Sequence, residues 1–245
     1  YKAPIGNGLI FTGGIYPCHI GYEVLASKDN WNYTRSWVSD MAPFYQAGIR
    51  VSYPFTKNFS AQLHVMNGWQ LIGDNNDAKT FGVQLMWNSE KVTAALNTLS
   101  GPETPGNNSL WRFLGDFYLI VRPRSWLNLA LVADLGFQQF EDRPTAIWYA
   151  GEGYLQFIPV SKLAIALRGG FFRDADNGIS GAEQTLAEGT ATIEVRPIDG
   201  FSLKLEGRYD YSTAPVFASS ERAEDGSVIK VPTQALLVLG GVAYF

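Results

Sequence analysis

The chain has little of what builds several common protein classes. Its 245 residues include one cysteine, Cys18, so no disulfide can form within the chain. Only two histidines are present, and no cluster of cysteine and histidine has the spacing of a zinc site. No apolar run reaches the roughly 18 residues that a transmembrane helix needs. A formal charge of −4 gives no reason to expect a nucleic acid as partner.

Alternation of apolar and polar residues is the dominant pattern, and segment 201–211 shows it most clearly. Its odd positions are Phe201, Leu203, Leu205, Gly207, Tyr209 and Tyr211. Its even positions are Ser202, Lys204, Glu206, Arg208 and Asp210. Because successive side chains of a strand point to opposite faces, one face of this strand is apolar and the other polar. Similar alternation along most of the chain predicts an all-β protein with lipid outside and water inside.

Short turns alternate with longer loops between the expected strands, as in outer-membrane barrels. The pattern predicts a transmembrane antiparallel β-barrel of about 12 strands, with residues 1–245 as a single outer-membrane domain. The expected strands are 8–15, 44–55, 59–69, 79–88, 91–100, 110–122, 126–138, 146–158, 162–172, 186–197, 201–212 and 233–245. Segments 91–100 and 233–245 alternate poorly.

The first eight residues have the pattern of a strand end followed by a turn. Tyr1-Lys2-Ala3-Pro4 is extended in character, and Ile5-Gly6-Asn7-Gly8 is typical of a tight turn into the next strand. We therefore expect further strands upstream, to a total of about 16. The alternative is a short N-terminal tail on a complete barrel of about 12 strands.

Aromatic residues gather at the two ends of the expected strands. At the ends with short turns we expect lipid-facing Phe55, Phe59, Trp87, Phe157, Phe201 and Phe245. At the opposite ends we expect Tyr45, Trp69, Phe81, Trp111, Phe137, Phe171 and Tyr211. Two such belts are typical of the interfaces on either side of a bilayer. A soluble sandwich would instead concentrate its aromatic residues in the middle of the strands.

Charged residues on the polar faces are the candidate pore lining. They are Arg50, Arg112, Asp116, Arg122, Asp134, Glu152, Arg168, Glu194, Arg196, Lys204, Glu206, Arg208 and Asp210. In a water-filled lumen such side chains set the ion preference and orient solute dipoles. Paired across strands, they could equally stiffen the wall. Because the two signs are nearly balanced, strong ion selectivity is not predicted.

The long first loop, Tyr16 to Pro43, is the candidate constriction. It carries Trp31, Tyr33, Arg35 and Asp40, and long loops in compact folds are usually functional or disordered. Folded inward, it would narrow the pore. The alternative is an external lid or a loop that faces a partner.

No catalytic or metal site is predicted. Asp74-Asn75-Asn76-Asp77 clusters oxygen ligands but lacks the spacing of a calcium loop, so a solvated turn is favoured. His64 and Ser60 share a face but lie roughly 13 Å apart along one strand, too far for nucleophilic catalysis. Lys79 and Arg173, near the outer rim, could contact lipopolysaccharide phosphates or merely extend toward water.

Several short strings add a family resemblance, strongest over residues 1–120. They are Gly21-Tyr22-Glu23, Asn30-Trp31-Asn32-Tyr33-Thr34-Arg35-Ser36, Ala47-Gly48-Ile49-Arg50, Asn67-Gly68-Trp69, Asp74-Asn75-Asn76, Lys79-Thr80 and Gly101-Pro102-Glu103. In this order they resemble the putative β-barrel porin-2 family, the OmpL-like outer-membrane porins of Gram-negative bacteria. The resemblance implies a pore-forming barrel and supplies no catalytic residues.

The expected function is passive diffusion of small hydrophilic solutes or ions through a water-filled lumen, without cofactor or enzymatic activity. The expected surroundings are outer-membrane lipid and lipopolysaccharide, with a homo-oligomer or an envelope-assembly partner as further options. The alternative is a structural barrel that sheaths or anchors a partner, such as a cytochrome or a surface protein. A lumen filled by side chains would favour that alternative.

Overall fold

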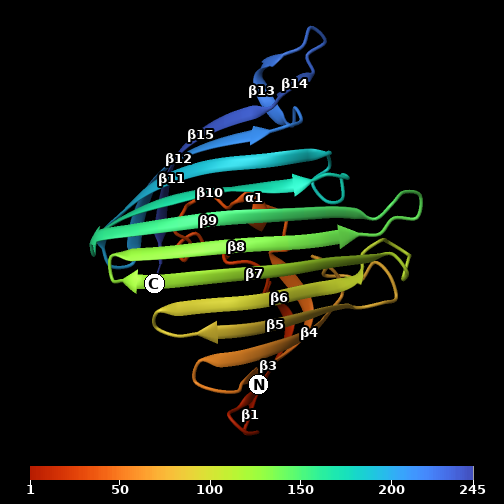
Figure 1. Cartoon of the computed structure of the whole chain (residues 1–245), viewed down its shortest axis with the longest axis vertical. Helices are drawn as coiled ribbons and strands as arrows, with labels where there is room; N and C mark the ends of the chain where they lie inside the picture. The colour runs from red at the N-terminus through yellow and green to blue at the C-terminus, as the bar shows by residue number, and fades with distance from the viewer. Residues whose placement is uncertain (245) are drawn as a thin grey trace.

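A computed structural model describes residues 1–244 as one 13-stranded sheet in which every neighbouring pair is antiparallel (Figure 1). Its order follows the chain: β1 (Lys2–Ala3), β2 (Leu9–Pro17), β3 (Tyr45–Pro54), β4 (Phe59–Met66), β5 (Thr80–Asn88), β6 (Val92–Pro102), β7 (Trp111–Arg124), β8 (Leu127–Gln138), β9 (Ala146–Val160), β10 (Leu163–Asp174), β11 (Gln184–Ile198), β12 (Phe201–Ser212) and β15 (Thr233–Ala243). A separate hairpin, β13 (Phe217–Arg222) with β14 (Val228–Val231), lies between β12 and β15.

Period-two alternation explains these strands. In β12, Leu205 is 45 % exposed, whereas Glu206 beside it is completely buried. The neighbouring β11 repeats the pattern in register, because Leu205 lies opposite Ile193 and Glu206 opposite Thr192. All twelve expected segments form strands of one sheet, and the short β1 is added at its edge. The predicted all-β fold class is confirmed.

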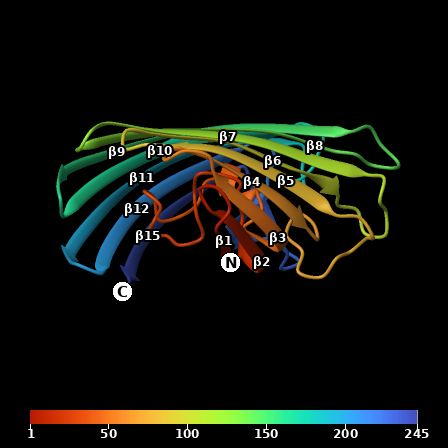
Figure 2. The same ribbon diagram turned by 90° about the horizontal axis from the view of Figure 1, so that it is seen from below.

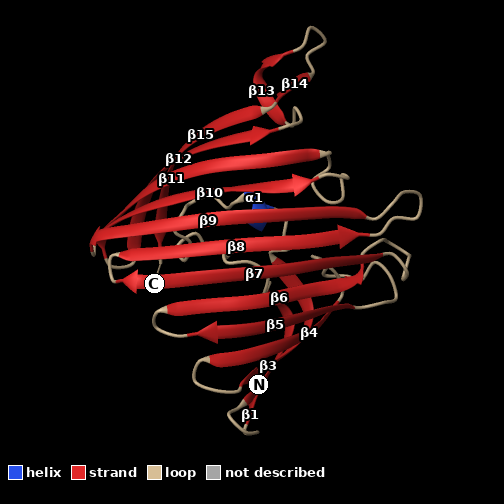
Figure 3. Cartoon of the chain, viewed as in Figure 1, coloured by secondary structure: helices blue, strands red, loops and turns tan. Residues whose placement is uncertain are grey.

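The sheet is strongly curved, so it has an inner, concave face and an outer, convex one. Figure 2 shows β7 to β9 on one side, with β12, β15, β1 and β2 bending round toward the other. The segment between β2 and β3, which holds the short helix α1 (Trp37–Asp40), lies within this curve (Figures 2 and 3). Across residues 1–244, β1 and β15 form the two edges and do not pair with each other.

The polar faces of the strands line the inner side, where the segment between β2 and β3 covers them. No helix among the described residues is both long and apolar enough to cross a membrane.

Two expectations about the strands need correction. The strand expected at 59–69 ends at Met66, where the chain turns and Asn67 donates from its side chain to the carbonyl of Ile72 at 2.7 Å. Trp69 therefore does not face lipid: its ring lies 4.9 Å from the guanidinium of Arg112 on the inner face. The long connection 213–232 is not a plain loop either, since it contains β13 and β14. Phe245, expected in one aromatic belt, lies outside the described residues.

A charge on the outer face is expected to destabilise the membrane-embedded sheet. We expect Leu205→Arg to lower the free energy of unfolding by about 2–4 kcal/mol, because it places a cation in the apolar band near mid-strand. Denaturant unfolding in phospholipid bilayers, followed by tryptophan fluorescence, measures this. Leu205→Met is the matched control and should stay within about 1.5 kcal/mol of the parent. Equal stability of the two variants would contradict a lipid-facing position for Leu205.

Candidate functional site

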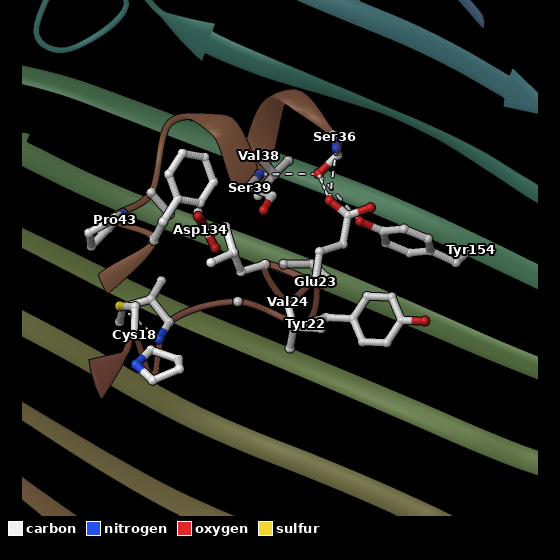
Figure 4. Close-up of a pocket in the computed structure, with 17 residues that line it drawn as sticks. Cys18, Tyr22, Glu23, Val24, Ser36, Val38, Ser39, Pro43, Asp134 and Tyr154 are labelled. Atoms are coloured by element: carbon white, nitrogen blue, oxygen red, sulfur yellow. Dashed lines mark hydrogen bonds between the residues drawn. The ribbon is translucent and has the colours of Figure 1, made fainter. Parts of the chain in front are cut away.

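The segment 18–44, called the inner loop from here on, packs against the inner face of the sheet. Helix α1 within it begins at the N-cap Ser36, whose hydroxyl accepts from the amide of Ser39 at 3.1 Å. Glu23, earlier in the loop, accepts from both the amide and the hydroxyl of Ser36, at 2.8 and 3.0 Å. Figure 4 shows Glu23 and Ser36 directed toward each other, with Tyr154 of the wall beside them. The two limbs of the loop are thus tied together.

Arg168 on β10 is the main anchor of this loop. Its guanidinium forms ion pairs of 2.9 Å with Glu23 of the inner loop and with Glu188 of β11. It also donates to the carbonyl oxygen of Thr34 at 2.6 Å. Arg208 on β12 extends the cluster, since it pairs with Glu188 at 3.1 Å. All these side chains except that of Thr34 are almost fully buried, so a buried network of charges holds the loop in its seat on the wall.

Glu206 and Lys204 of β12 form a second anchor through the backbone of the loop. The carboxylate of Glu206 accepts from the amides of Tyr33 and Thr34 at 2.5 and 2.9 Å. The ammonium of Lys204 donates to the carbonyl oxygens of Ser27 and Asn30 at 2.8 and 2.6 Å. Charge-assisted bonds to backbone groups are the stronger class of hydrogen bond.

The ring of Tyr33 packs onto β15. A β-carbon built on Gly240 would meet this ring at 2.3 Å, so a glycine is needed for the close approach. On β12, Asp210 accepts from the indole nitrogen of Trp37 at 2.8 Å. The loop is therefore held from β10 across to β15.

The start of the loop is fixed to the inner face as well, on the strands of the other half of the sheet. The ring of His19 stacks on His64 of β4, with centroids 4.0 Å apart. Its two nitrogens contact the side-chain oxygen of Gln46 at 3.1 Å and the carbonyl of Thr98 at 2.9 Å. Two residues on, the amide of Gly21 donates to Asp116 of β7 at 3.1 Å. The loop thus spans the inner face.

The comparisons with known proteins agree with this architecture. A family model described as putative beta-barrel porin-2, OmpL-like, matches residues 1–245. The chain belongs to this family. Membership supports a porin-type channel of the outer membrane rather than an enzyme.

Two solved structures align with this porin. The outer membrane channel DcaP of Acinetobacter baumannii aligns with a TM-score of 0.65 and 9 % identity, over 96 % of this chain and 71 % of that chain. A NanC porin aligns with a TM-score of 0.44 and 12 % identity, over 82 % of this chain and 93 % of that chain. The first likeness shows the fold alone, and the second is too weak to carry an argument. No curated protein matches the chain.

The structure places all the predicted pore-lining charges of this porin on the inner face. Buried among them are Asp116, Asp134, Glu152, Arg168, Glu194, Lys204, Glu206, Arg208 and Asp210. Partly exposed are Arg50, Arg112, Arg122 and Arg196. Six of the buried ones contact the inner loop, namely Asp116, Arg168, Lys204, Glu206, Arg208 and Asp210. These six hold the loop in place, and a role for the whole set in lining an open pore stays a prediction.

The four predicted constriction residues lie in the inner loop in different settings. Trp31 packs edge-on against Tyr22, with ring centroids 5.4 Å apart. Arg35 is partly exposed over the ring of Phe44, at 5.0 Å. Tyr33 faces β15, as described above, and Asp40 is exposed at the end of α1. Arg35 and Asp40 are therefore the charged side chains of this set that reach solvent.

Sequence reasoning missed two members of the anchor, Glu23 and Glu188. Glu188 lies on the same face of β11 as Thr190 and Thr192, so the alternation of polar and apolar residues could have found it. Glu23 has no such signal, because it lies in an irregular loop 145 residues before Arg168. Only the fold brings these two side chains together.

Other predicted polar positions near the outer rim have local partners. Asp74 binds Lys79 through an ion pair and accepts from the amide of Asn76 at 3.2 Å. Arg173 donates to the hydroxyl of Thr185 at 2.9 Å. Contact of Lys79 and Arg173 with lipopolysaccharide stays a prediction. Among residues 1–244, no group of three or more His, Cys, Asp or Glu side chains could hold a metal ion.

A cavity of about 60 Å³ lies between the inner loop and the wall (Figure 4). Cys18, Val38, Asp134 and Tyr154 are among its lining residues. Cys18 is partly buried there, and desolvation raises the pKa of its thiol to about 12. The amide of Ile20 donates to its sulfur at 3.3 Å. The thiol therefore stays protonated at neutral pH.

Removing the central guanidinium should loosen the inner loop. We expect Arg168→Met to destabilise the loop seat by about 3–5 kcal/mol, because Glu23 is left buried without a cationic partner. Limited proteolysis within residues 18–44 and the Tm measure the effect. The control is Arg196→Met. The side chain of Arg196 is 35 % exposed, so its ion pair with Glu194 should contribute less than about 1 kcal/mol to stability. Equal cleavage rates in the two variants would contradict the anchor.

Cys18 should react slowly with thiol reagents. The thiolate is the reactive form, and a raised pKa keeps it scarce up to pH 9. We expect maleimide labelling of Cys18 at least about tenfold slower than labelling of Ser220→Cys, made in a Cys18→Ser background on the exposed hairpin. The comparison is run on folded protein at pH 7 and pH 9. Similar rates for the two thiols would show that Cys18 is not enclosed.

Proposed function

We propose that this porin is a diffusion pore of a Gram-negative outer membrane, through which small hydrophilic solutes or ions pass without energy coupling or cofactor. The inner loop narrows the lumen. The single observation that carries the proposal is the seat of this loop, which is fixed by buried charges to the inner faces of β7, β10, β11 and β12. A loop fixed in this way sets a constant cross-section, which is what a size-limited diffusion pore requires.

The outer and inner faces support the same proposal. Leucine, isoleucine and aromatic side chains are exposed on the convex side, including Leu167, Ile193, Leu203 and Tyr209. Such a surface fits lipid, whereas the concave side carries the charged and amide side chains, together with apolar clusters that pack against the inner loop. Family membership adds the porin-type role. Lipid and lipopolysaccharide are then the immediate surroundings.

Planar-bilayer recording of the purified protein tests the proposal. We expect discrete conductance steps in potassium chloride, and partial block by sugars up to a limiting size. Arg35→Ala should change the step size and raise that limit, since it removes a partly exposed side chain of the inner loop. Arg124→Ala, an exposed residue at a turn end of β7, should leave the limit unchanged.

The contrary outcome is also informative. A silent bilayer, with folding shown by heat-modifiable gel mobility, would contradict the open pore and favour a structural barrel that sheaths a partner. Equal conductance steps in the wild-type protein and Arg35→Ala would support the pore but contradict a role of the inner loop in its constriction.

A further inference from the structure

Acidic and basic side chains on the inner face differ in their exposure to water. Every aspartate and glutamate in the 13 described strands of the sheet lies on the inner face and is buried. The basic residues of this face divide instead: Arg168, Lys204 and Arg208 are buried, whereas Arg50, Arg112, Arg122 and Arg196 keep part of their surface exposed. The near-balance of charge in the sequence is therefore lost on the part of the inner face of the strands that water can reach.

Most of the buried carboxylates have specific partners, whereas both carboxylate oxygens of Glu152 and Oδ1 of Asp134 have no hydrogen-bond partner among the described residues. Glu188 and Asp210 bind arginines of the wall, at 2.9 and 2.8 Å. Glu206 and Asp116 accept from backbone amides of the inner loop. Asp174 accepts from the amides at the start of the next loop, the closest at 2.6 Å from Gly178. Because these charges are shielded by protein, a solute in the lumen meets little of their field.

Three of the partly exposed arginines have only neutral hydrogen-bond partners among residues 1–244, and of these Arg112 also lies within electrostatic range of Glu103. Arg50 is 3.4 Å from the hydroxyl of Thr12, Arg112 donates to the side chain of Gln138 at 2.6 Å, and Arg122 donates to Thr93 at 3.0 Å. None of the three forms an ion pair within these residues. Arg196 differs, because Glu194 lies 2.5 Å away.

The three unpaired arginines are spread along the height of the wall. Arg112 and Arg122 lie near opposite ends of β7, about 33 Å apart at the usual rise per residue. Arg50 lies in the middle of β3, opposite His64 of β4. The side chains of all three point to the inner face. A solute that crosses the membrane along this wall meets unpaired positive charge near the start, middle and end of its path.

The inner loop does not restore the balance. Lys28 and Asp29 pair with each other at 2.8 Å, and Glu23 is buried. Of the remaining charges, Asp40 is exposed and Arg35 partly exposed. These two are of opposite sign, so the surplus set by the wall remains positive.

We propose that the lumen prefers anions, and that Arg50, Arg112 and Arg122 set this preference for chloride and for small carboxylate or phosphate solutes. The inference rests on the proposed function as a pore. Guanidinium groups suit oxyanions because their donors match two oxygens at once. Charge of one sign on a low-dielectric wall also concentrates the counter-ion in the water beside it. Both effects favour anions over cations of the same size.

The reversal potential in a potassium chloride gradient tests this proposal in planar bilayers. We expect the wild-type channel to pass chloride more readily than potassium. In the double variant Arg50→Gln/Arg122→Gln the chloride-to-potassium permeability ratio should fall at least about twofold. Raising the salt concentration should weaken the preference, because exposed charges are screened beyond about 10 Å at 0.1 M ionic strength.

Arg173→Gln is the control for a single charge: it removes one arginine charge from the outer face of β10. Its permeability ratio should equal that of the wild type. A wild-type channel that is unselective or prefers potassium would overturn the inference while leaving the pore intact. So would an equal change in Arg173→Gln and the double variant. A protein that folds but never conducts would overturn the pore, and the preference with it.

Discussion

The guanidinium of Arg168 is the contact on which the inner structure depends. It is almost fully buried, and it joins Glu23 of the inner loop to Glu188 of the wall at 2.9 Å each. A charge in such a place is stable only with partners at good geometry, because the cost of removing it from water is several kcal/mol. The same constraint acts on the carboxylates. Loop and wall therefore share the ion pairs of Arg168, although both carboxylate oxygens of Glu152 nearby have no hydrogen-bond partner among the described residues.

This mutual dependence connects the fold to its permeability. A strand with one polar face needs water or protein on that face, and the inner loop supplies protein over part of it. Where the loop lies, acidic side chains accept from its amides, as Glu206 does from Tyr33 and Thr34. Where the wall stays open, arginines such as Arg50 and Arg122 remain. The position of the loop thus decides which charges of the inner face remain accessible to water.

Alternation in the sequence predicts most of the sheet and the side on which each charge lies, because a strand leaves only two faces to choose from. It fails where strands end: alternation alone extends β4 to Trp69, whereas the Asn67-Gly68 pair marks the turn after Met66 that takes the indole to the inner face. It also fails for contacts between distant segments, since Glu23 and Arg168 meet only through the curvature of the sheet. Exposure is a property of the assembled wall, so the balanced count of charges in the sequence does not show which of those charges water can reach.

Much of the anchoring of the inner loop passes through its backbone rather than its side chains. Lys204 binds the carbonyls of Ser27 and Asn30, and Glu206 binds the amides of Tyr33 and Thr34. Bonds to main-chain groups are indifferent to the residue type that carries them. Side chains of the loop that reach solvent are consequently free to change while the seat persists. If the inner loop forms the proposed constriction, such a wall holds it in place through residues that differ from the loop side chains that reach solvent.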